Sequence, residues 1–308
     1  MNILRTPDER FQNLPGFAYA PNYLEDLPGY ECLRLHYIDE GPRDTAQVFL
    51  CLHGEPTWSY LYRRMIPVFT QAGHRVVAPD YFGFGRSDKP VDDAQYTFTF
   101  HREALLRFIE RLDLRAITLV CQDWGALLGL TLPMDMPDRF ERLLLMNGAL
   151  ATGDVRLNTG FLEWRAWARE HPDMDIASLM KRTCPHLTAD ECAAYAAPFP
   201  EARYKAGVRR FPDIVPDSPD ADGAAIARRA RDWWRKEWNG PSFMAVGVQD
   251  PILGPDVMRQ VHKLINGCPL PYQVQEAGHF VQEWGESVAL KALEVFKDTC
   301  VLHSRGNE

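Results

Sequence analysis

No part of this 308-residue sequence has the long apolar run or the clustered positive charge that marks a membrane or nucleic-acid protein. Its longest apolar stretches fall well short of the roughly 18 residues that a membrane-spanning helix needs. Lysine and arginine are spread along the chain, and the net charge is −8. Binding to phosphates requires basic side chains gathered in one place. We therefore expect neither a membrane nor a nucleic acid as partner.

Cysteine is sparse and shows no metal-binding or redox spacing. The seven cysteines are scattered: Cys32, Cys51, Cys121, Cys184, Cys192, Cys268 and Cys300. Without a CxxC pair, a zinc finger or a thioredoxin-like site is not expected. The first ten residues are charged and contain no apolar segment, so no signal peptide is expected either. Isolated thiols are typical of a reducing compartment, and the sequence predicts a cytoplasmic protein that uses no metal or cofactor.

Short apolar runs alternate with helical patterns along much of the chain. The runs are continuous rather than alternating, as strands of a parallel sheet covered on both faces must be. A helical pattern over 101–112 places its apolar residues on one face. The sequence therefore predicts an α/β fold with a mostly parallel central sheet flanked by helices. The predicted buried strands are residues 47–52, 75–78, 117–121, 143–146 and 243–248.

Residues 151–229 interrupt this alternation. They contain helical patches at 161–169 and 188–196, several prolines, and no pattern of a buried strand. We interpret them as a helical cap inserted into one α/β core, which residues 1–150 and 230–308 would form together.

The hexapeptide VCQDWG at residues 120–125 joins a predicted strand directly to a predicted helix. The small residues Cys121 and Gly125 stand two positions on either side of Asp123. A nucleophile elbow needs small neighbours of this kind, because its tight turn presents one side chain above the sheet. An aspartate between a strand and a helix can also be only an N-cap, and the hexapeptide alone leaves both interpretations open.

Two later positions favour a catalytic role for Asp123. Asp250 follows the predicted strand 243–248, and His279 comes just after a predicted strand at 272–274. Open α/β sheets place their sites at the carboxyl ends of strands, where all three residues would lie. A lone histidine or an aspartate before proline is usually structural. The order nucleophile, acid, histidine makes an Asp–His–Asp triad the better interpretation.

A glycine at the end of the first apolar strand indicates an oxyanion hole. In HGEPTW, Gly54 permits close approach of the backbone, and the amides of Glu55 and Trp124 would be the two donors. His53, in the same motif, is interpreted as structural. The GxG at residues 83–85 lacks the third glycine of a dinucleotide-binding loop, so a nucleotide site is disfavoured.

Together, HGEPTW, DYFGFGRSDKP, VCQDWG, VQDPILGPDVM and GHFVQEWGE resemble the haloalkane dehalogenases of the α/β-hydrolase fold. The resemblance runs over nearly the whole chain, and it is strongest to the branch typified by dichloroethane dehalogenase. In that branch the triad acid follows the later strand, as Asp250 does. The alternative acid position holds Asn147, which cannot ionise.

The resemblance also implies how halide and substrate are bound. It assigns halide binding to Trp124 and Trp164, although Trp164 and Trp167 could by spacing alone form the packed face of a helix. It places Phe161 and Leu127 in the substrate pocket. Leu127 replaces an aromatic residue, and the chain from 147 to 164 is short, so the pocket is expected to differ in shape.

The chemistry implied is hydrolysis of a haloalkane to a primary alcohol, halide and a proton through a covalent alkyl-aspartate ester. A carboxylate nucleophile suits this reaction, because an ester can be hydrolysed whereas the ether left by a serine cannot. Two alternatives stay open: an epoxide hydrolase using Tyr195 or Tyr204 as acid, and a non-catalytic binding protein. A fluoroacetate-type dehalogenase is disfavoured because Trp124 replaces the carboxylate-binding arginine. A monomer or small homo-oligomer is expected.

Overall fold

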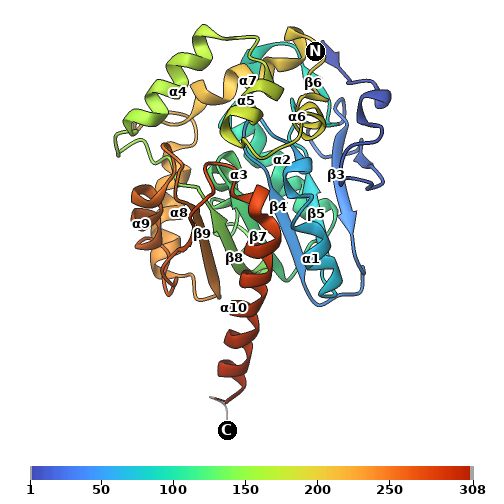
Figure 1. Ribbon diagram of the computed structural model, residues 1–308. Helices are drawn as coiled ribbons and strands as arrows, with labels where there is room; N and C mark the ends of the chain where they lie inside the picture. Colours follow the sequence, from blue (N-terminus) through green and yellow to red (C-terminus); the bar gives the residue numbers. More distant parts are fainter. Residues whose placement is uncertain (1, 306–308) are drawn as a thin grey trace.

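The structure is a computed structural model that describes residues 2–305, with the side chains of residues 2–297 (Figure 1). Its centre is an eight-stranded sheet with the order β10-β9-β8-β7-β4-β5-β3-β2. The six strands from β10 to β5 in this order run parallel. At that side of the sheet β3 pairs antiparallel with β5, and β2 pairs antiparallel with β3. The strands are β2 (Asn22–Leu24), β3 (Leu35–Glu40), β4 (Val48–Leu52), β5 (Arg75–Pro79), β7 (Ile117–Gln122), β8 (Phe140–Met146), β9 (Ser242–Gly247) and β10 (Tyr272–Val274).

The burial of each strand explains whether it could be predicted from an apolar run in the sequence. Every residue of β4, β7 and β9 is buried, so neither face of these strands tolerates a polar pattern. The predicted α/β fold with a mostly parallel sheet is confirmed. The edge strand β2 and its neighbour β3 have polar and half-buried positions, such as Asp39 and Glu40, and a search for apolar runs misses them. A separate small sheet pairs β1 (Ile3–Leu4) with β6 (Lys89–Pro90).

Helices cover both faces of the sheet (Figure 1). The predicted helix at 101–112 begins earlier, at Phe98, because the Thr97 side chain accepts a hydrogen bond from the amide of Phe100 and caps the helix there. The helices that flank the sheet are α1 (Ile66–Gln71), α2 (Phe98–Arg111), α3 (Trp124–Gly129), α8 (Ala224–Lys236), α9 (Pro255–His262) and α10 (Gly285–Arg305). No described helix is long and apolar enough to cross a membrane.

The chain between β8 and β9, all of it described, contains helices and no strand. Four of these helices gather at one end of the sheet (Figure 1). They are α4 (Thr159–Glu170), α5 (Ile176–Thr183), α6 (Ala189–Ala196) and α7 (Ala206–Arg210). The expected cap boundary at residue 229 falls inside α8, whose Trp234 indole donates to the carbonyl of Leu130 in the core. The division into core and cap stays a prediction.

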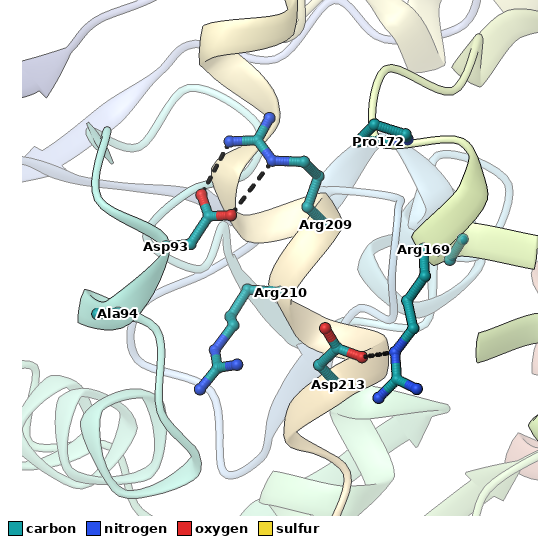
Figure 2. Close-up of a pocket in the computed structure, with 8 residues that line it drawn as sticks. Asp93, Ala94, Arg169, Pro172, Arg209, Arg210 and Asp213 are labelled. Atoms are coloured by element: carbon teal, nitrogen blue, oxygen red, sulfur yellow. Dashed lines mark hydrogen bonds and ion pairs between the residues drawn. The ribbon is translucent and has the colours of Figure 1, made fainter. Parts of the chain in front are cut away.

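Two ion pairs link these helices to neighbouring segments, as Figure 2 shows. Arg209 of α7 pairs with Asp93, which lies in a 3-10 turn just before α2, at 2.8 Å. Arg169 of α4 pairs with Asp213 at 2.7 Å. The pairs flank a surface cavity of about 360 Å³. Because these side chains are partly exposed, each pair contributes little stability, and apolar packing holds the helices.

Candidate active site

Asp123 sits in a strained turn between β7 and α3. Its backbone has φ 51° and ψ −123°, a conformation that a non-glycine residue rarely adopts. Two glycines permit this turn. A Cβ on Gly125 would lie 2.0 Å from the carbonyl oxygen of Leu52, and one on Gly54 would lie 2.6 Å from the Cβ of Asp123. The hexapeptide therefore forms a tight, strained turn from strand to helix, which is the backbone geometry that its small residues indicated.

The substitution Gly125→Ala tests this account of the turn. We expect it to lower the free energy of unfolding by about 2–3 kcal/mol, because the added methyl group meets rigid backbone. Urea unfolding monitored by circular dichroism measures the change. Gly129→Ala in the same helix is the matched control, since its Cβ would meet no backbone and its nearest neighbours would be the Cδ1 atoms of Leu52 and Leu119 at 3.0 and 3.3 Å. If the two variants unfold at the same urea concentration, the steric account of the elbow is wrong.

His279 lies between the two aspartates. Its Nδ1 is 2.8 Å from Oδ2 of Asp250, and its Nε2 is 3.6 Å from Oδ2 of Asp123. Asp250 is buried and accepts two further hydrogen bonds, from Nδ2 of Asn147 at 2.7 Å and from the amide of Ile252 at 2.8 Å. These bonds fix the carboxylate that orients the imidazole, as the third member of a triad does.

Burial and neighbouring charges shift the pKa values of His279, Asp250 and Glu55. Burial opposes protonation of His279, but Asp250 and Asp123 outweigh it and raise the pKa of the imidazole well above its usual value. Burial would raise the pKa of Asp250, yet the charge of His279 and the hydrogen bonds from His279 and Asn147 lower it. Burial and the neighbouring Asp123 raise the pKa of Glu55 well above its usual value. Both effects favour the neutral form of the Glu55 carboxyl group.

The Asp123 carboxylate accepts a hydrogen bond from a backbone amide. The amide of Glu55 donates to Oδ1 of Asp123 at 2.9 Å. Trp124 is the first residue of α3, where an amide has no acceptor within the helix. His53 behaves as a structural residue, because its Nε2 accepts from the amide of Tyr81 and its Nδ1 lies 2.9 Å from the carbonyl oxygen of Gly54.

A cavity of about 390 Å³ opens above Asp123, and apolar side chains make up much of its wall. Seven residues proposed from the sequence line it: Glu55, Asp123, Trp124, Leu127, Phe161, Trp164 and His279. Asp250 lies behind His279, away from the cavity. Among residues 2–297, no three His, Cys, Asp or Glu side chains are arranged to hold a metal ion.

Two indole N–H groups are available to this cavity. Three other tryptophans donate to protein acceptors, namely Trp58 to Ala194, Trp234 to Leu130 and Trp238 to Ser242. Trp124 and Trp164 line the cavity and donate to no other described residue. The ring of Trp124 is held by Phe211, whose centroid is 4.4 Å away.

The tyrosines that an epoxide hydrolase would need lie elsewhere. Tyr195 is fully buried, and its hydroxyl is bonded to Glu283 and Arg63. Neither Tyr195 nor Tyr204 lines the cavity. In the described part of the chain no tyrosine lines the cavity that contains Asp123, and the epoxide alternative is not favoured.

Sequence reasoning missed several residues that shape the site. Asn147 was considered only as a replaced acid, whereas it is a hydrogen-bond partner of Asp250. Its place at the end of β8, on the edge shared with Asp123 and Asp250, was the available signal. Arg231 and Arg235 of α8 also reach the cavity, and no motif marks them.

Comparison with known proteins identifies the family. Residues 47–286 match the family model of the alpha/beta hydrolase fold. The chain is 45% identical to a haloalkane dehalogenase of Psychrobacter cryohalolentis, covering 97% of this chain and 99% of the relative. It is 43% identical to a haloalkane dehalogenase of Mycobacterium marinum, covering 92% and 95%.

A solved structure agrees with these sequence matches. The tetrameric haloalkane dehalogenase DpaA from Paraglaciecola agarilytica NO2 superimposes with a TM-score of 0.94 at 53% identity, covering 96% of this chain and 98% of that one. The resemblance drawn from the motifs is confirmed. The chain belongs to the haloalkane dehalogenases, hydrolases of the α/β-hydrolase fold that act on carbon–halogen bonds.

Proposed function

We propose that this enzyme removes the halide through a covalent alkyl ester on Asp123, which water activated by His279 then hydrolyses. The observation that carries the proposal is the position of His279, with one nitrogen toward Asp123 and the other bonded to the buried Asp250. The use of the Asp250 branch of the family, rather than an acid at position 147, is part of this proposal.

In the first step, an oxygen of Asp123 attacks the carbon that bears the halogen. The new carbon–oxygen bond forms as the carbon–halogen bond breaks, and the halide leaves with the electron pair. An unpaired anion in an apolar cavity is costly. The indoles of Trp124 and Trp164 are donors without an acceptor, so they would stabilise the departing halide as its charge develops.

In the second step, Nε2 of His279 accepts a proton from water, and the hydroxide attacks the ester carbonyl carbon. The amides of Glu55 and Trp124 would stabilise the resulting oxyanion. Collapse of this intermediate breaks the bond to the alkoxide, which takes its proton from His279 and leaves as the alcohol. The carboxylic acid left on Asp123 then loses the net proton and becomes a carboxylate again. The net products are an alcohol, a halide and one proton.

Isotope labelling tests the covalent route. With enzyme in excess over a bromoalkane in ¹⁸O-water, the first turnover should yield an alcohol without label, because its oxygen comes from Asp123. The label should instead appear in the peptide that contains Asp123, as read by mass spectrometry. A first-turnover alcohol that carries ¹⁸O would show direct attack by water and would overturn the mechanism.

The cavity supports small to medium chlorinated or brominated alkanes as substrates, with primary alcohols as products. Phe161 and Leu127 would contact the alkyl chain. A small homo-oligomer is also proposed, because the similar DpaA structure is tetrameric. Independence from cofactors and a cytoplasmic location stay predictions.

A further inference from the structure

The cavity above Asp123 is also lined by residues of α8, α9 and the segment 149–158. It has an apolar wall, to which Leu253, Val257, Val261 and Leu264 contribute. Its other lining residues include three arginines: Arg156, Arg231 and Arg235. We call these three residues the arginine rim.

The arginine rim carries positive charge that the protein does not neutralise. Arg231 is paired with Asp154 at 2.9 Å. Arg156 and Arg235 form no hydrogen bond or ion pair with any described residue. Arg231 and Arg235 lie four residues apart on α8, so both project from the same face of the helix.

Among the described residues that line the cavity, the acidic ones are Asp123 and Glu55, and the amide of Glu55 donates to Asp123. The arginine rim comes from α8 and residues 149–158, which are other segments than the turn that carries Asp123. The cavity thus combines a candidate nucleophile, an apolar wall and a cationic rim. Two unpaired guanidinium groups in a chain of net charge −8 favour an anion at that rim.

We propose that the enzyme accepts haloalkanes that carry a carboxylate at the end remote from the halogen, with Arg156 and Arg235 binding this carboxylate. The proposal rests on the proposed function of the catalytic end. Planar guanidinium groups match carboxylates in geometry and charge. Short haloacids are disfavoured, because their carboxylate would lie beside Asp123 and away from the rim. The apolar wall would hold the connecting alkyl chain.

The test compares two bromides with the same chain length, ω-bromohexanoate and n-hexyl bromide. The measured quantity is the ratio of their kcat/KM values from halide release. The double substitution Arg156→Gln with Arg235→Gln should lower this ratio about 10-fold, mainly through KM, because two solvated ion pairs are lost. The ratio in the wild type should also fall at high salt, which screens the pairs.

Lys236→Gln is the matched control, since it removes the same charge from α8 at a position that does not line the cavity. Its ratio should equal that of the wild type. An unchanged ratio in the double variant would overturn the proposal. So would an equal loss with both bromides, because the rim would then act on the departing halide and not on the substrate.

A binding measurement separates this proposal from the catalytic one. Hexanoate has no halogen, and its binding to the cavity can be followed through the fluorescence of Trp124 and Trp164. We expect the double variant to bind hexanoate about 10-fold more weakly than Lys236→Gln does. If the double variant and Lys236→Gln bind hexanoate equally well, the arginine rim does not bind the carboxylate, even if the enzyme is active. Tighter binding by the wild type with no halide release would refute only the proposed catalysis.

Discussion

Replacing His279 by glutamine is expected to let each enzyme molecule release one halide and then stop. Attack by Asp123 needs no base, whereas hydrolysis of the ester needs a group that takes a proton from water. Loss of a triad histidine typically lowers turnover by about 10⁴-fold or more. Rapid-quench halide measurement should show a burst equal to the enzyme concentration. The intact mass should increase by one alkyl group, located on Asp123 by peptide mapping.

Two outcomes would contradict this expectation. Continued turnover at a wild-type rate would show that His279 is not the base, and an unmodified protein after the burst would rule out a covalent ester. Asp123→Asn is the control, because it removes the nucleophile and should give neither burst nor mass change.

The charges in the site are consistent with Asp123 acting as the nucleophile and His279 as the base of the second step. Asp250 and Asp123 together raise the pKa of His279 in the free enzyme. When Asp123 becomes an ester it loses its negative charge, and the pKa of His279 should fall. The imidazole then becomes the neutral base that the second step requires. The same logic predicts that ester hydrolysis is lost as the pH falls through this lowered pKa.

Replacing Trp124 by phenylalanine is expected to lower kcat/KM by about 10²–10³-fold, the usual cost of removing one donor to a charge that develops in the transition state. Trp164→Phe should act in the same direction. Phenylalanine keeps most of the apolar volume and the contact with Phe211, so the variant removes chiefly the N–H. Halide release from a bromoalkane measures the effect.

Trp167→Phe is the matched control for Trp164. Its ring lies 5.3 Å from that of Trp164 in the same helix, but it does not line the cavity. We expect Trp167→Phe to change kcat/KM by less than about 3-fold. If Trp167→Phe and Trp164→Phe lose activity equally, the effect comes from helix packing and not from halide binding.

The sequence by itself determined the parts of this protein that depend on local pattern. Central strands buried on both faces must be continuously apolar, so their runs could be read directly. Asp123, Asp250 and His279 each follow such a strand, and parallel strands bring their carboxyl ends to one edge. The motifs around them were therefore enough to predict the fold, the family and a candidate triad.

Only the tertiary structure decided which side chains outside those motifs reach the cavity. Trp164 and Trp124 line one cavity, Asn147 bonds to Asp250, and Arg235 lines the same cavity as Arg156, although the members of each pair lie far apart in the chain. Helical spacing alone could not separate a cavity-lining tryptophan from a packed one. The reason is physical: a helix pattern shows which face is apolar, whereas the packing of distant elements decides whether that face meets core or cavity.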